Sequence, residues 1–267
     1  MNRNRQFLTQ AYYQRMIVQL DASRAYWEDK VLAEDFPGQG ETLRAQTVKD
    51  ELFFALLLKY TAGEPPERLV ESLVRYVDAL EEYQKRLANN EQEPSISPLS
   101  IEHELSQYEE FIQVVSLCIL LFRKDLLLRV LALTDNAGYE GDDLVYESIV
   151  ARVVERGRCD DGWYHPHYSM LIQAMDCVTD GDQVAATRCL SEYCEAWYEG
   201  FEHTNVPWFD THSWMTDHDG AYFGYWAFEA GAYAYLFGIE DSQVSSMVYP
   251  RDLVAYARSH KPTGTGQ

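Results

Sequence analysis

Hydrophobic residues recur at spacings of three and four along almost the whole chain, and no run alternates strictly between apolar and polar positions. The first spacing is typical of amphipathic helices, whereas alternation would indicate strands, so the pattern predicts an all-α fold. We expect a two-part bundle of about nine to eleven helices. The first helix carries apolar positions from Phe7 to Trp27 and the third from Leu69 to Leu87; the others lie near 41–61, 99–133 (as one or two helices), 143–156, 167–179, 183–201, 220–238 and 250–259.

The segment TDNAGYEGDD at 134–143 is rich in turn residues and poor in apolar ones, which is typical of a domain boundary. A chain of 267 residues can form one large domain or two smaller ones. We therefore predict an N-terminal helical domain at 1–133 and a C-terminal helical domain at 134–260. Residues 261–267 are predicted to form a disordered tail.

The stretch 220–242 is aromatic, alanine-rich and glycine-rich, and Glu229 is its one charged residue between Asp219 and Glu240. Such a length could span a membrane, but its tyrosines, its central glutamate and the lack of a second such stretch favour a buried helix. We expect hydroxyl and indole donors of this and neighbouring helices to bond Glu229; the alternative is a general acid whose pKa burial raises. The predicted core around Glu229 comprises Tyr222, Tyr225, Trp226 and Tyr233.

The composition sets limits on function. Hydrophobic residues make up 46% of the chain, which is enough for a folded core. The formal net charge of −21 repels phosphate backbones and anionic membranes, so we expect neither as a direct partner. The five cysteines include no CxxC pair, and the first residues do not look like a signal peptide, so we expect reduced thiols and a cytoplasmic location.

The acidic residues are distributed unevenly. Residues 1–133 hold 21 acidic and 15 basic residues, whereas 134–267 hold 22 and 7. The third helix is expected to neutralise itself, because four of its acids precede a basic residue by four positions. These pairs are Glu64–Arg68, Glu71–Arg75, Glu81–Lys85 and Glu82–Arg86.

The expected helix at 183–201 differs from that pattern. Its acids fall within an arc of roughly 80° at about 100° per residue, opposite an apolar side, with no basic partner expected along the helix. The acids are Glu192, Glu195, Glu199 and Glu202, and the apolar side holds Leu190, Cys194, Trp197, Tyr198 and Phe201. Between 159 and 250 there are 15 acidic residues and a single basic one, Arg188. A solvated, solubilising face and a surface for a basic partner both fit this bias.

Two catalytic hypotheses are weaker. His165 and His167, together with DTHSWMTDHDG at 210–220, have the composition of a metal site, but not the spacing of a known one. Acids beside Trp163, Trp208 and Trp214 could also serve a carbohydrate enzyme, although no carboxylate pair stands out. An all-α metal-dependent or carbohydrate-dependent hydrolase is therefore the alternative function. We predict no metal, no cofactor and no catalytic residue.

The last part of the chain carries a series of short motifs: Tyr222, Gly224-Tyr225-Trp226, Phe228-Glu229-Ala230, Ile239-Glu240-Asp241-Ser242, Tyr249-Pro250-Arg251-Asp252-Leu253-Val254 and Tyr256-Ala257-Arg258. In these residues it resembles the PoNi-type immunity proteins, which neutralise polymorphic DNase toxins of bacterial type VI secretion. Gly231 departs from the alanine expected in that turn and would let another helix approach closely. The motif describes a core helix and a capped last helix, so it bears on fold rather than on contact residues.

The resemblance implies a non-enzymatic inhibitor that binds a cognate toxin, most simply a basic nuclease domain, in the producer's cytoplasm. The acidic surface fits this role because nucleases present basic clefts to DNA. Whether the free chain forms a homodimer is left open. The candidate toxin-binding residues are Asp160, Asp161, Glu192, Glu195, Glu199, Glu202, Asp210, Asp217 and Asp219, with the partly exposed aromatics Trp163, Trp208 and Trp214 as anchors.

Overall fold

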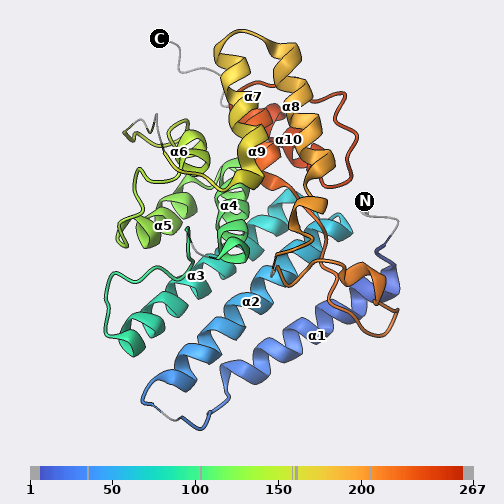
Figure 1. The fold of residues 1–267 in the computed structure, drawn as a ribbon. Coiled ribbons are helices and arrows are strands. Elements are labelled where there is room, and N and C mark those ends of the chain that lie inside the picture. The colour runs from blue at the N-terminus through green and yellow to red at the C-terminus, as the bar shows by residue number, and fades with distance from the viewer. Residues whose placement is uncertain are drawn as a thin grey trace. The chain divides into compact units, whose positions relative to one another are not determined.

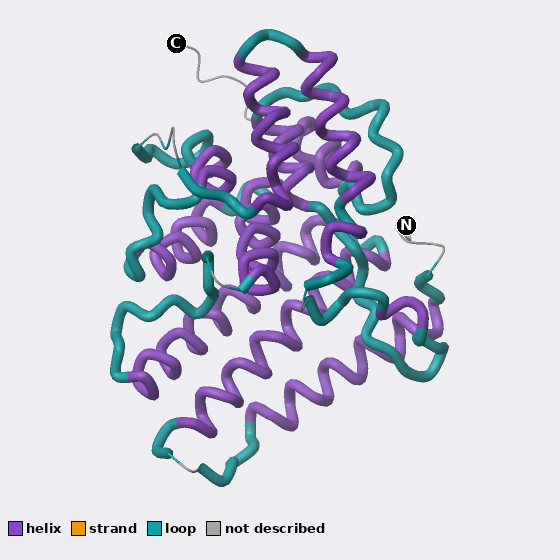
Figure 2. The backbone as a smooth tube through the Cα atoms, viewed as in Figure 1, coloured by secondary structure: helices purple, strands orange, loops and turns teal. Residues whose placement is uncertain are grey.

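The computed structural model describes residues 7–34, 36–102, 104–157, 159, 162–204 and 206–260. Within these residues the chain forms ten α-helices and three short 3-10 helices, joined by loops and without a strand (Figures 1 and 2). The predicted all-α class is thereby confirmed. The tail predicted at 261–267 lies outside the described residues.

The helices mostly follow the predicted ranges, with α6 and α9 shorter than expected. Their bounds are α1 Gln10–Glu28, α2 Gln39–Ala62, α3 Pro66–Glu91, α4 Leu105–Leu120, α5 Lys124–Asp135, α6 Leu144–Val150, α7 Ser169–Thr179, α8 Gln183–Ala196, α9 Phe228–Leu236 and α10 Arg251–Ser259. The 3-10 helices are η1 Pro166–Tyr168, η2 Glu199–Phe201 and η3 Thr211–Ser213.

Contacts divide the chain into two units of interleaved segments. Unit 1 joins 1–98, 128–138 and 208–224, and unit 2 joins 99–127, 139–207 and 225–267. Segments distant in sequence thus share a unit. The division into consecutive domains at 133/134 stays a prediction about which parts fold independently.

Unit 1 is built on α1, α2 and α3, which pack in chain order (Figure 1). α3 buries the apolar stripe that predicted it, including Leu69, Leu73 and Leu80. Its first turn begins at Pro66, where the missing N–H group loses no helical hydrogen bond. The stripe therefore fixes which side of α3 faces the core of unit 1.

The segment before α9 is extended, so the predicted helix at 220–238 is wrong over its first half. The Tyr12 hydroxyl donates to the carbonyl of Tyr222 at 3.1 Å and accepts from its N–H at 2.9 Å. Thr61 donates to the carbonyl of Phe223 at 2.7 Å. Gly224 has a φ of 117°, in a region that side chains disfavour. Bonds to α1 and α2 within unit 1 have replaced the helical bonds that the composition predicted.

In unit 2, α4 is buried over most of its length and packs against α9, which in turn contacts α10. α7 and α8 pack against each other as a helical pair (Figure 1). A Cβ atom on Gly231 would lie 2.6 Å from Pro250 and 3.1 Å from Val254. Glycine at this position therefore permits the close approach of α9 and α10, as predicted.

Candidate functional site

The outer side of α8 presents the predicted row of carboxylates. α8 begins after Asp182, whose carboxylate accepts from the N–H of Ala185 at 2.9 Å and caps the helix. The helix ends at Ala196, but Trp197 and Tyr198 keep right-handed helical dihedral angles up to η2. The phase of the side chains is thus kept, and four acids lie on one exposed side. We call Glu192, Glu195, Glu199 and Glu202 the α8 acidic face.

One of these acids has a partner that the sequence-based prediction excluded. The Arg188 guanidinium lies 4.0 Å from the Glu192 carboxylate, and both side chains are largely exposed. Glu195 accepts only a long bond of 3.3 Å from the Ser191 hydroxyl. Among the described residues, Glu195, Glu199 and Glu202 form no ion pair. Three of the four carboxylates therefore carry uncompensated charge.

The remaining candidates divide between the two units. Trp163 belongs to unit 2, with 45% of its surface exposed, and its ring lies 4.4 Å from that of His165. Asp160 and Asp161 lie outside the described residues. The other candidates belong to unit 1, in the loop before Tyr222. The described candidates are therefore divided into one group in each unit.

In unit 1, Asp210, Asp217 and Asp219 are exposed, and Asp217 accepts from the Thr9 hydroxyl at 2.8 Å. Trp214 is 55% exposed, as an anchor would be. Trp208 is only 9% exposed, so the expectation of a partly exposed side chain is wrong for it. The packing of unit 1 encloses the Trp208 ring.

Glu229 of α9 lies against the inner side of α8. Tyr193 donates its hydroxyl to the Glu229 carboxylate at 2.6 Å, and Trp197 donates its indole N–H to the same oxygen at 2.9 Å. Glu229 is 1% exposed, and burial raises its pKa to about 7, against the lowering effect of these bonds. The hydroxyl and indole donors expected from this or neighbouring helices are present: Tyr193 belongs to α8, and Trp197 directly follows its last residue.

The predicted neighbours of Glu229 are all buried but have other roles. The Tyr233 hydroxyl shares a 2.7 Å hydrogen bond with Ser148, and Tyr222 belongs to unit 1. Tyr193 and Trp197 were missed, although a tyrosine and a tryptophan four residues apart on one helix side are a recognisable donor pair. Glu229 is enclosed, so it has the environment of a structural acid and no access for a substrate.

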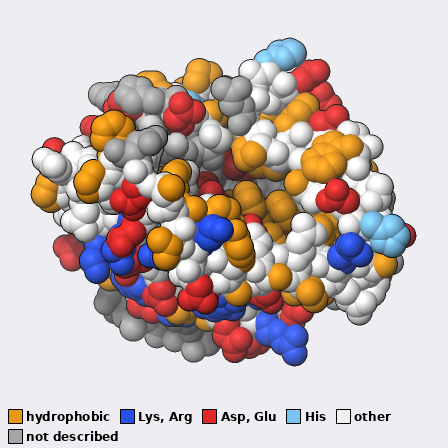
Figure 3. All heavy atoms as spheres, turned by 90° about the horizontal axis from the view of Figure 1, so that it is seen from below, with side chains coloured by type: hydrophobic (Ala, Val, Ile, Leu, Met, Phe, Trp, Pro, Cys, Tyr) orange, Lys and Arg blue, Asp and Glu red, His pale blue; other side chains and the backbone are white. Residues whose placement is uncertain are grey.

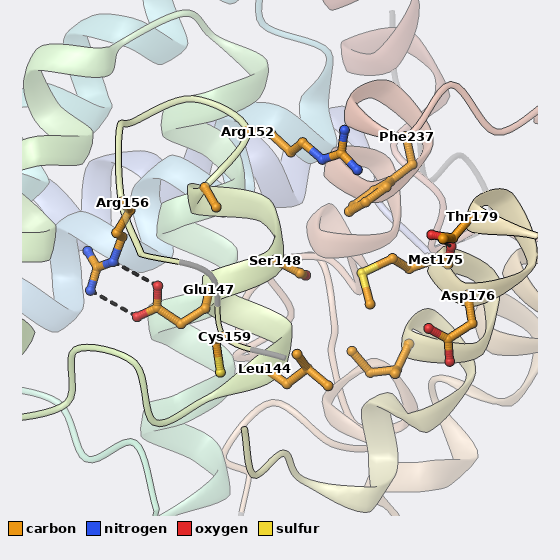
Figure 4. Close-up of a pocket in the computed structure, with 12 residues that line it drawn as sticks. Leu144, Glu147, Ser148, Arg152, Arg156, Cys159, Met175, Asp176, Thr179 and Phe237 are labelled. Atoms are coloured by element: carbon orange, nitrogen blue, oxygen red, sulfur yellow. Dashed lines mark hydrogen bonds and ion pairs between the residues drawn. The ribbon is translucent and has the colours of Figure 1, made fainter. Parts of the chain in front are cut away.

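A cavity of about 640 Å³ lies in unit 2 between α6, α7 and the end of α9 (Figure 4). On one side the Arg156 guanidinium pairs with Glu147 at 2.7 Å, and both side chains are buried. On the other side the Arg152 guanidinium lies 4.6 Å from the centre of the Phe237 ring. Met175 and Asp176 of α7 also line the cavity (Figure 4). Glu147 also accepts from the N–H of Gly141 at 2.8 Å, so both a cation and a backbone donor hold its carboxylate in place.

The histidines of the metal hypothesis make other contacts. The His165 ring nitrogen lies 3.0 Å from the carbonyl of Ile101, and burial lowers the pKa of His167 to about 4. In the described part of the chain, no three His, Cys, Asp or Glu side chains are grouped so that they could hold a metal ion. None of the described helices is long and apolar enough to cross a membrane.

Comparison with known proteins bears on the same part of the chain. Residues 141–253, which include α8, the extended segment and α9, match a family model described as PoNe immunity proteins (PoNi), C-terminal. The family resemblance is thus confirmed. The match covers less than half of the chain, and it supports a toxin-neutralising immunity function with a cognate toxin as partner.

A solved structure supports the fold. Protein PA2201 from Pseudomonas aeruginosa matches with a TM-score of 0.68 and 15% sequence identity, covering 94% of this chain and 89% of that one. At this identity the match shows a shared fold and nothing further. No curated protein sequence matches the chain.

Proposed function

We propose that this chain is the immunity protein of a basic nuclease toxin, a DNase effector of a type VI secretion system, and binds it through the α8 acidic face. The single observation that carries the proposal is the row of exposed carboxylates inside the segment that matches PoNi, three of which form no ion pair with a described residue. Like charges along one helix destabilise it slightly. A cationic partner would offset that repulsion.

The chemistry of the partner follows from the charge. A DNase holds its substrate by neutralising phosphates with Lys and Arg, and spaced carboxylates can occupy the same cleft. Complementary charge raises the rate of encounter more than the affinity itself. Inhibition by binding needs no cofactor and takes place where the toxin would act, in the cytoplasm of the producing cell.

Aromatic side chains would hold the complex once formed. Trp163 is the exposed tryptophan of unit 2, the unit that contains the α8 acidic face. Large aromatic residues dominate binding energies at protein interfaces. In unit 1, Trp214 with Asp210, Asp217 and Asp219 is a second group of candidate contacts. Separate Trp163→Ala and Trp214→Ala variants would show which group the toxin touches.

The test compares two charge reversals of equal size. One variant carries Glu195→Lys, Glu199→Lys and Glu202→Lys. The control carries Glu67→Lys, Glu71→Lys and Glu91→Lys, at three exposed positions of α3. Both change the net charge by the same amount. The partner is the toxin recovered by pull-down from the native host, and association rates are measured from low to moderate salt.

We expect the α8 variant to associate at least about tenfold more slowly at low salt and to lose most of its salt dependence. The α3 variant should change much less, because it alters only the overall field. Equal effects of the two reversals would exclude the α8 acidic face as the docking surface. A recovered toxin without nuclease activity would exclude the DNase assignment while leaving the docking surface to be judged by the rates.

A further inference from the structure

α1 of unit 1 is apolar on two sides. One side is buried through Tyr12, Met16 and Leu20. The other side remains in solvent, with Val18 68% and Tyr26 55% exposed. Two exposed alanines complete this outer side, which we call the α1 apolar face: Val18, Ala22, Ala25 and Tyr26. At about 100° per residue, the four positions fall within an arc of roughly 100°.

Two opposite charges frame the α1 apolar face. Arg15 lies seven residues before Ala22, and Asp29 lies seven residues after it. Seven residues are about two turns, so both point to the same side of α1 as Ala22. Both are exposed, and neither forms an ion pair with another residue that the structure describes. The face is therefore cationic at one end and anionic at the other, with Ala22 midway.

We propose that this face binds the same face of a second copy of the chain, with the two α1 helices antiparallel and Ala22 opposite Ala22. A two-fold axis at Ala22 makes the contact self-complementary, so each pair of residues occurs twice. Val18 of one copy then faces Tyr26 of the other, and Arg15 faces Asp29. The small side chain of Ala22 lets the helices approach within the usual packing distance of about 8–10 Å.

The register follows from the same arithmetic. A shift of one turn in one direction places Tyr26 opposite Gln14, and a shift in the other places Val18 opposite Lys30. Either shift also separates Arg15 from Asp29. Only the register centred on Ala22 buries both large apolar side chains and pairs both charges. A face for an unrelated partner would need neither this symmetry nor charges at equal distances from one residue.

A charge exchange tests the pairing between copies. Arg15→Asp alone and Asp29→Arg alone each place like charges opposite one another at both ends of the contact. Sedimentation velocity should show each variant dissociating at least about tenfold more readily than the wild-type dimer. An equimolar mixture of the two variants should restore dimers, because the aspartate introduced into one chain would then face the arginine introduced into the other.

The double variant Arg15→Asp with Asp29→Arg should likewise dimerise as the wild type does. Circular dichroism checks that every variant is folded. We expect all of them to fold, because both positions are exposed. If the mixture and the double variant stay monomeric while the single variants are folded, the pairing is wrong.

A cysteine pair tests the register. Ala22→Cys places two thiols at the two-fold axis, so mild oxidation with diamide should link two chains. Ala11→Cys is the matched control, since Ala11 is also exposed on α1. Its two copies would lie about 33 Å apart, given 22 positions and a rise of about 1.5 Å per residue. The wild-type chain corrects for links through its native cysteines.

We expect a linked dimer for Ala22→Cys and none above the wild-type level for Ala11→Cys. Equal linking of the two variants, or a wild-type chain that is monomeric at about 100 μM, would overturn the proposal. A third outcome would also overturn it: an Ala22→Cys chain that stays monomeric and whose thiol only the toxin protects from alkylation. The α1 apolar face would then bind the toxin instead of a second copy.

Discussion

α3 and the α8 acidic face both carry several acidic residues, but they differ in how many of these carboxylates have a cation partner. On α3, Glu82 lies 2.6 Å from Arg86, and Arg68 lies 3.2 Å from Glu64. Glu81 pairs with Arg129 at 2.7 Å, instead of with Lys85 as predicted. Asp78, Glu81 and Glu82 of α3 thus each have a cation partner. Glu67, Glu71 and Glu91 form no ion pair with a residue that the structure describes, so the predicted Glu71–Arg75 pair is wrong. In the α8 acidic face, the one ion pair among the described residues is the weak contact between Arg188 and Glu192. Glu192 alone of these four acids therefore has a cation partner among the described residues.

Figure 3 shows what balanced charge looks like on one face of the molecule, where Lys and Arg side chains lie among Asp and Glu. Net charge alone does not distinguish such a face from the α8 acidic face. What distinguishes them is how many of the carboxylates have a cation within reach, because paired charges are largely neutralised at a distance. Removing single charges from α3 and from the α8 acidic face, and measuring stability, tests this difference.

The largest effect on stability is expected from Glu229→Gln, in the buried acid of α9 that accepts hydrogen bonds from the inner side of α8. Burial raises the folded-state pKa of Glu229 from 4.5 to about 7. The protonated acid therefore contributes stability below pH 4.5, and this contribution is lost as the pH rises through 7. The wild type should lose about 3 kcal/mol relative to the variant over that range, at about 1.4 kcal/mol per pH unit.

Urea unfolding at a series of pH values measures this loss. Glutamine keeps an oxygen that can accept from Tyr193 and Trp197, so the variant should fold. Asp143, whose pKa burial raises to about 6, titrates in both proteins and cancels in the difference. Parallel stability curves for wild type and variant would show that Glu229 does not titrate in this range.

A smaller effect is expected from removing the cation that α3 depends on. Arg129 donates to the carboxylates of Asp78 and Glu81 at 2.7 Å in each case, and Arg129→Gln leaves both without this shared cation. We expect a loss of about 1 kcal/mol, since these side chains are partly exposed and solvent screens the pair. The matched control is Arg188→Gln on α8, which should change the free energy of unfolding by no measurable amount. Equal losses would contradict the contrast between the helices.

The smallest effect should differ in sign between the two helices. Glu82→Gln on α3 removes an ion pair, whereas Glu199→Gln on α8 removes repulsion from Glu195 and Glu202. Each change is worth about 0.2–0.5 kcal/mol at low salt, destabilising for the first and stabilising for the second. Chemical unfolding of both variants at low and high salt would show whether each substitution raises or lowers the free energy of unfolding. A destabilised Glu199→Gln variant would mean that this carboxylate already has a stabilising contact.

Local patterns predicted much of this molecule. The spacing of apolar residues located most of the helices, and it placed the α8 acids opposite an apolar side that includes Trp197, because side-chain direction in a helix follows from sequence position alone. The same spacing could not show that Arg129 would reach Glu81, since that contact joins α5 to α3 across 48 positions. Nor could it show that Trp208 would be enclosed.

The segment 220–227 shows why such limits exist. Its composition favours a buried helix, and α9 forms where the backbone bonds close locally. Upstream of α9, the N–H and carbonyl of Tyr222 bond to Tyr12, which lies 210 positions away. Helix period, charge imbalance and the burial of Glu229 depend on neighbours in sequence, so they were readable from the chain. The partners of Tyr222 and Glu229 and the membership of each unit depend on distant segments meeting, which only folding decides.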